Sequence, residues 1–181
     1  MSENPLLSPW NTPFGLPPFG AIEPAHFPPA FEAAMAAHRI EIAEIGANPA
    51  APSFANTVEA LEGAGRLLSR IGATFFNLVA SHATETLPQV ERDIAPKLAA
   101  HRMAVALDPA LFRRVAALHQ QREGLALAPD QHRLLERLHL RLMRAGAGLD
   151  AKARARLSEI STPLATLHTS FGQNVLADEN E

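Results

Sequence analysis

The 181-residue sequence contains no cysteine. Without cysteine the chain can have neither disulfide bonds nor thiolate metal ligands, and nothing ties it to an oxidising compartment. A reducing cytoplasm is therefore the expected location.

Long apolar runs are also absent. Nowhere do roughly eighteen apolar residues follow one another, as a membrane-spanning helix requires. The first residues, from Met1 to Trp10, have neither the basic segment nor the sustained apolar segment of a secretion signal. The sequence thus predicts neither membrane insertion nor export.

A strong excess of one charge sign is missing too. The chain has 16 Lys and Arg against 19 Asp and Glu, a formal net charge of -3. This balance gives no electrostatic reason to expect a nucleic acid or an anionic membrane as partner. Hydrophobic residues make up 47% and charged residues 19%, which is typical of one globular domain with a sizeable core.

Residues 1–27 form a segment unlike the rest of the chain. Of the 15 prolines, eight lie within the first 29 residues, and each fixes φ and removes a backbone donor. The segment is therefore predicted to be an extended arm. It also carries apolar side chains that need cover, either from the chain itself or from a partner. These are Trp10, Phe14, Phe19, Ile22 and Phe27.

Residues 28–181 are predicted to form one all-α domain, an antiparallel bundle of about six helices, because apolar residues recur at helical spacing and no alternating strand pattern is present. The first helix begins at Pro28 and stops at Gly46. The second is capped by Asn56, with Glu59 completing a capping box, and is expected to continue for more than six turns. Its inward residues would be Val58, Leu61, Leu68, Ile71, Phe75 and Leu78.

The remaining four helices have recognisable starts. A third runs over about 88–106, where Pro96 should kink or split it. Asp108 caps a short fourth helix that reaches about residue 121. A fifth runs over about 129–146, and Asp150 caps a sixth over about 151–177, with Pro163 inside. The inward residues of the fifth helix are predicted as Leu134, Leu135, Leu138, Leu142 and Met143.

Motifs for metal or nucleophilic catalysis are not found. A helical zinc site requires His-Glu-x-x-His, and this pentapeptide does not occur among the eight histidines. The nearest pairs, His132 with Glu136 and His132 with His139, favour surface or helix-pairing roles over ligation. There is no Gly-x-Ser-x-Gly elbow. We therefore predict no catalytic, cofactor-binding or metal-binding residue in this chain.

Other candidates have simpler interpretations. Gly63 with Gly65 inside a helix, and Gly146 with Gly148 at a helix end, indicate close packing or turns rather than a phosphate loop. The carboxylate pairs Glu41 with Glu44 and Glu59 with Glu62 are typical of solvated helix faces. On adjacent positions, one ring of the Phe75-Phe76 pair must point away from the centre of the helix face, and a core role is favoured.

A basic stripe lies in the last third of the chain. A solvated face or a domain-docking surface is favoured over phosphate binding, because the segment contains no aromatic side chain that could stack on bases. Its members are Arg133, Arg137, Arg141, Arg144, Lys152, Arg154 and Arg156.

Four strings occur in an order and spacing that resemble the N-terminal portion of the thimet oligopeptidase family of zinc metallopeptidases, closest to its bacterial peptidyl-dipeptidase and oligopeptidase A members. The strings are PFGAIEPAHFPPAF at 18–31, NPAAPSFANT at 48–57, RAGAGL at 144–149 and FGQN at 171–174. The resemblance covers nearly the whole chain.

The resemblance implies that the parent protein is a zinc peptidase that hydrolyses short peptides, either internally or by releasing dipeptides. The zinc ligands of the family lie far beyond residue 181, so the segment alone is expected to be inactive and to hold no zinc. Its implied role is part of the wall of the substrate channel, and its partners are the missing C-terminal catalytic part of the same chain and short peptides. The segment would then be an excised domain or a remnant. The alternative is an autonomous helical interaction module without catalysis, and nucleic-acid binding ranks last.

Overall fold

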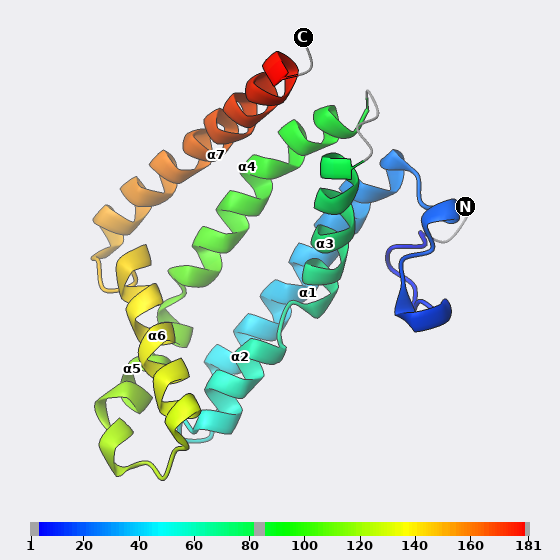
Figure 1. The fold of residues 1–181 in the computed structure, drawn as a ribbon. Helices are drawn as coiled ribbons and strands as arrows, with labels where there is room; N and C mark the ends of the chain where they lie inside the picture. Colours follow the sequence, from blue (N-terminus) through cyan, green and yellow to red (C-terminus); the bar gives the residue numbers. More distant parts are fainter. Residues whose placement is uncertain (1–3, 82–85, 180–181) are drawn as a thin grey trace. The chain divides into compact units, whose positions relative to one another are not determined.

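The computed structural model describes residues 4–81 and 86–179 (Figure 1). Helices dominate these residues and no strand occurs among them, so the predicted all-α class is confirmed. The helices are α1 (Phe27–Ala47), α2 (Ala60–Gly63), α3 (Arg66–Ser81), α4 (Leu87–Ala106), α5 (Pro109–Gln120), α6 (Pro129–Ala145) and α7 (Ala151–Glu179).

The described chain divides into two compact units. Unit 1 contains the described residues of Met1–His38, Gly65–Leu98 and Pro163–Glu181, and unit 2 contains Arg39–Ala64 and Ala99–Thr162. The predicted division into an arm over 1–27 and one domain over 28–181 follows a different criterion and stays a prediction.

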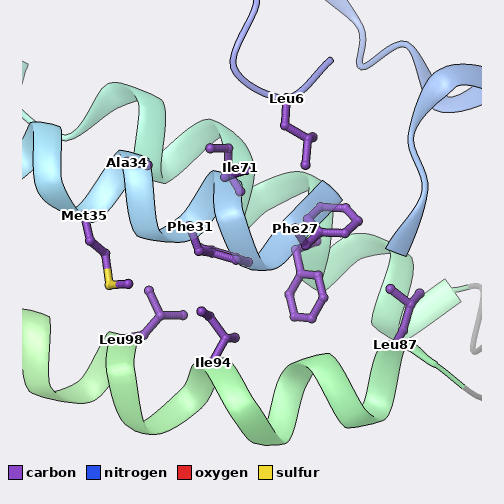
Figure 2. Close-up of a cluster of buried hydrophobic side chains, with 11 residues drawn as sticks. Leu6, Phe27, Phe31, Ala34, Met35, Ile71, Leu87, Ile94 and Leu98 are labelled. Atoms are coloured by element: carbon purple, nitrogen blue, oxygen red, sulfur yellow. The ribbon is translucent and has the colours of Figure 1, made fainter. Parts of the chain in front are cut away.

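Unit 1 has a buried hydrophobic cluster in which aromatic rings contact one another (Figure 2). The Phe75 ring contacts Phe27 and Phe31 edge to face, with centroids 4.9 and 5.4 Å apart. All three side chains are essentially inaccessible to solvent. Phe76 is 38% exposed, as expected when two rings occupy adjacent helix positions. Ala30, Ala34, Met35, Ile71, Leu87, Ile94 and Leu98 complete the cluster together with Leu6.

Part of the predicted arm packs against α1 and α3 within unit 1. Leu6 is fully buried in the aromatic cluster. The Arg70 guanidinium donates hydrogen bonds to the carbonyls of Leu6 (2.9 Å) and Ser8 (3.2 Å), and lies 4.5 Å from the centre of the Trp10 ring. Phe14 and Phe19 remain 99% and 48% exposed. The chain itself thus covers the first part of the arm; residues 1–3 lie outside the described residues.

The predicted second helix is not continuous, which corrects the sequence analysis. It is divided at Ala64 and Gly65 into α2 and α3. Gly65 has φ +69°, and a Cβ atom there would lie 3.0 Å from the His38 ring. This left-handed conformation next to a close neighbour suits glycine and interrupts the helix. Gly63 is therefore the last residue of α2, and Gly65 lies in the break between α2 and α3. The two glycines do not lie inside one helix.

The start of this region also differs from the prediction. The cap is Ser53, whose hydroxyl accepts from the Asn56 backbone N–H (3.1 Å), while Asn56 Oδ1 accepts from the Ser53 N–H (2.8 Å). Asn56 is thus the third residue of the capping box, not its first. A π-helical segment, Phe54–Glu59, follows and leads into α2.

The other helix predictions are mostly confirmed. Asp108 accepts from the N–H groups of Ala110 and Leu111, and so caps α5. The helix α4 is not split at Pro96. In α6, Leu135, Leu138 and Leu142 are buried. Leu134 and Met143, also predicted inward, are 36% and 44% exposed, because they lie at the margins of a narrower apolar face.

Candidate functional site

The segment 48–57 of unit 2, part of the resemblance, is held by one arginine. Arg114 of α5 is 7% exposed. Its Nη1 donates to the carbonyls of Asn48 (2.8 Å) and Ala50 (3.1 Å). Its Nη2 donates to Asn56 Oδ1 (2.8 Å) and its Nε to Thr57 Oγ1 (3.3 Å). No local signal in the sequence singles out Arg114, because its acceptors lie 57 to 66 positions earlier in the chain.

Two histidines of unit 2 stack against each other, which the sequence analysis also missed. The rings of His119 (α5) and His139 (α6) lie 3.9 Å apart at an interplanar angle of 9°, and Phe112 extends the stack beyond His139. Burial and the Arg122 cation lower the pKa of His119. Burial and His119 itself lower the pKa of His139. Both imidazoles are therefore mainly neutral near pH 7.

Of the two predicted pairs that involve His132, the structure forms the pair with Glu136 but not the pair with His139. His132 Nδ1 lies 3.8 Å from Glu136 Oε1, and Nε2 lies 3.7 Å from Glu123 Oε1. The hydrogen bond from Arg133 is the main cause that lowers the pKa of Glu136. His139 packs on His119 instead of pairing with His132. The His132–Glu136 pair is thus a contact along one helix, in agreement with the helix-pairing interpretation.

Residues 4–81 and 86–179 contain neither a cluster of metal-ligating side chains nor a helix that could span a membrane. Within these ranges, no three or more His, Cys, Asp and Glu side chains are grouped so that they could hold a metal ion. No helix within the same ranges has the length and apolarity needed to cross a bilayer.

The glycine and glutamate pairs singled out in the sequence lie at a helix end, at a side-chain contact or on the surface. Gly146 ends α6 with φ +101°, in agreement with its turn role. Gly148 lies against the Met143 side chain, 3.1 Å from where its Cβ would be. Glu41 and Glu44 line an open cavity of about 400 Å³ together with Asn48 and Asn56. Glu59 and Glu62 lie on exposed surface.

Part of the basic stripe lines a cavity in unit 2. The cavity has a volume of about 330 Å³ and lies between α2 and α6. Its charged lining residues are Glu62, Arg137, Arg141 and Arg144, and its apolar ones are Leu134, Leu138 and Leu140. Arg133 and Arg156 of the same stripe are instead paired with Glu136 and Glu159, each at 3.1 Å.

The unit 1 part of α7 has one polar and one apolar side. On the polar side, Gln173 Nε2 donates to the Pro88 carbonyl (3.1 Å) and to Glu91 Oε2 (3.0 Å), and Arg92 donates to Gln173 Oε1 (2.7 Å). These contacts hold α7 against α4. The other side carries exposed apolar residues at spacings of three and four: Leu164, Leu167, Phe171 and Val175, which are 50%, 65%, 69% and 41% exposed. We call these four residues the α7 apolar face.

The chain is similar to bacterial peptidases over nearly its whole length. No family model matches the chain. The chain is 41% identical over 177 residues to a dipeptidyl carboxypeptidase of Salmonella typhimurium, which is 98% of this chain and 26% of that protein. It is 38% identical over 174 residues to a dipeptidyl carboxypeptidase of Escherichia coli, again 26% of its length.

Similarity to a second group of peptidases is lower but equally extensive. The chain is 28% identical over 173 residues to oligopeptidase A of Salmonella typhimurium, covering 96% of this chain and 25% of that protein. It thus spans about a quarter of the length of the curated relatives that it matches. The chain is a homologue of these bacterial peptidases, and the family resemblance predicted from the sequence is confirmed.

Proposed function

We propose that this chain is the N-terminal helical part of a zinc-dependent peptidase that hydrolyses short peptides, and that it forms part of the wall of the substrate channel. The observation that carries the proposal is the match of 98% of the chain to one quarter of a dipeptidyl carboxypeptidase at 41% identity. In this proposal the chain positions and confines the peptide, while the rest of the parent supplies zinc and the hydrolytic groups.

The side-chain chemistry of the chain is consistent with that division of labour. The described residues offer no donor set that fits zinc, so we assign no step of hydrolysis to them. A wall made of helices needs no reactive side chain, since it acts by width and by surface contacts. The isolated chain is therefore expected to be inactive with or without added zinc, and its expected location is the cytoplasm.

The α7 apolar face supports the existence of a partner surface. Phe171 and Leu167, the most exposed of the four residues, are large apolar side chains on one face of the helix. Contiguous exposed apolar patches commonly mark interfaces. We propose that the remaining part of the peptidase covers this face in the parent protein.

A chimera tests the proposal directly. The chain would replace the matched segment of the Salmonella typhimurium dipeptidyl carboxypeptidase, and hydrolysis of a short peptide would be measured in the presence of zinc. The matched controls are the relative without this segment and the 181-residue chain alone. We expect activity in the chimera and none in either control.

Each other result has a defined meaning. Activity of the chain alone would contradict the absence of catalytic residues. An inactive but folded chimera, with the parent relative active, would contradict the channel-wall role and favour an autonomous interaction module. The docked arm, with Leu6 buried, is the feature that such a module would share.

A further inference from the structure

The cavity between α2 and α6 has an unusual balance of charge. Three guanidinium groups, from Arg137, Arg141 and Arg144, line it together with the single carboxylate of Glu62. Their spacing of four and three residues places the arginines on one side of α6. We call this cavity the α6 arginine pocket.

The three arginines are not neutralised within the described part of the chain. Arg133 and Arg156 have glutamate partners three residues away, but Arg137, Arg141 and Arg144 make no hydrogen bond or ion pair with any described residue, Glu62 included. Like charges three and four residues apart repel each other along a helix and destabilise it. An anion bound in the pocket would remove this repulsion.

The shape and lining of the pocket restrict the anion. The planar guanidinium group binds carboxylates and phosphates through two parallel N–H bonds. Leu134 and Leu140, which are 36% and 41% exposed, add apolar surface, and the third leucine of the lining, Leu138, is buried. No aromatic side chain lines the pocket, so nucleic-acid bases would find no stacking partner. A carboxylate attached to aliphatic groups fits this lining best.

We infer that the α6 arginine pocket binds the carboxylates of short peptides. The inference rests on the proposed function and deepens it, because it gives the carboxylates of the peptide a binding site on this part of the parent. Two sources offer the same chemistry: the C-terminal carboxylate of a peptide, and the side chains of aspartate and glutamate within it.

Binding of labelled peptides to the 181-residue chain tests the inference. The probe is a fluorescein-labelled Leu-Glu-Ala-Leu-Glu-Leu peptide, followed by fluorescence anisotropy at low salt. Two further probes separate the sources: the same peptide with a C-terminal amide, and the same peptide with glutamine in place of glutamate. Loss of affinity on amidation identifies the C-terminal carboxylate, and loss with glutamine identifies the side chains.

Two matched double variants provide the control. Arg137→Gln/Arg141→Gln removes two charges from the pocket, whereas Arg102→Gln/Arg113→Gln removes two exposed charges of unit 2 outside it. We expect the first variant to bind the acidic peptide about tenfold or more weakly, because charge-assisted bonds are lost, and the second to change affinity less than about twofold. Circular dichroism would verify that both variants remain helical.

Three results would overturn the inference: no binding of the acidic probe by the unmodified chain, equal affinities of the two variants, or equal affinities for all three probes. The same variants in the chimera separate this inference from the proposed function. If the chimera hydrolyses a neutral peptide and the pocket variant does not alter its relative rates for the acidic, amidated and glutamine-containing peptides, the function stands and the carboxylate site fails. If the pocket variant only destabilises the chimera, the arginines instead form ion pairs with the rest of the peptidase.

Discussion

The substitution Arg114→Met would test what holds unit 2 together. Methionine keeps an unbranched stem in a site that is 7% exposed, but removes the charge and every donor. The four acceptors, on Asn48, Ala50, Asn56 and Thr57, would lose their shared partner. The segment 48–57 would then keep its internal hydrogen bonds, among them the capping bonds between Ser53 and Asn56.

The magnitude follows from these four bonds. Each contributes about 1 kcal/mol after the desolvation of the guanidinium is subtracted. The carbonyls of Asn48 and Ala50 lie near the surface and would regain water, whereas Thr57 is fully buried and would not. We therefore expect a loss of about 3 kcal/mol in the free energy of unfolding. For a chain of this size that loss lowers Tm by about 9 °C.

Urea unfolding followed by circular dichroism measures this loss. The control is Arg113→Met, which removes an exposed arginine one position earlier in α5 and should change stability by less than about 0.5 kcal/mol. Limited proteolysis should cut segment 48–57 faster in the Arg114 variant only. Equal stabilities of the two variants would refute the reasoning, because the hydrogen bonds of Arg114 would then contribute nothing.

Three further predictions concern other contacts. Gly65→Ala should destabilise by about 1–2 kcal/mol in thermal melts because of the positive φ and the adjacent His38 ring, while Gly63→Ala, with open space around its Cβ, should change stability by about 0.5 kcal/mol or less. Phe75→Ala should cost about 3–5 kcal/mol in urea unfolding, and Phe76→Ala, which is 38% exposed, clearly less; similar losses would contradict the core assignment. Folding lowers the pKa values of His119 and His139. The stability that the neutral histidine pair contributes is therefore fully present above the unfolded pKa of about 6.5, and it is lost as the pH falls through the folded pKa values. The groups facing this pair include Arg122, Glu136 and His132. The urea midpoint should therefore fall on acidification, and His139→Phe should flatten that fall; an unchanged profile in the variant would contradict the role of the pair.

Local sequence signals predicted the helices well where the signal acts within a few residues. Asp108 and Asp150 cap α5 and α7 because an aspartate oxygen reaches N–H groups two or three residues ahead. Gly146 ends α6 because glycine adopts a positive φ at little cost. The helical spacing of Phe75 indicated an inward position, and Phe75 is fully buried.

Structural features that depend on distant residues were predicted poorly from the sequence. The break at Gly65 arises next to His38, which lies 27 positions earlier, so a periodic apolar pattern alone suggested one continuous helix. The same holds for Leu134 and Met143, because helical spacing does not fix how wide the buried face is.

The sequence by itself determined that the chain is all-α, where most helices start and end, and which peptidase family it resembles. Only the tertiary structure decided that Arg114 binds segment 48–57, that His119 stacks on His139, and that three arginines share a pocket with Glu62. The reason is physical. Helix caps and apolar periodicity depend on residues a few positions apart. Long-range hydrogen-bond partners, and the residues that bury an apolar helix face, depend instead on which distant segments pack together.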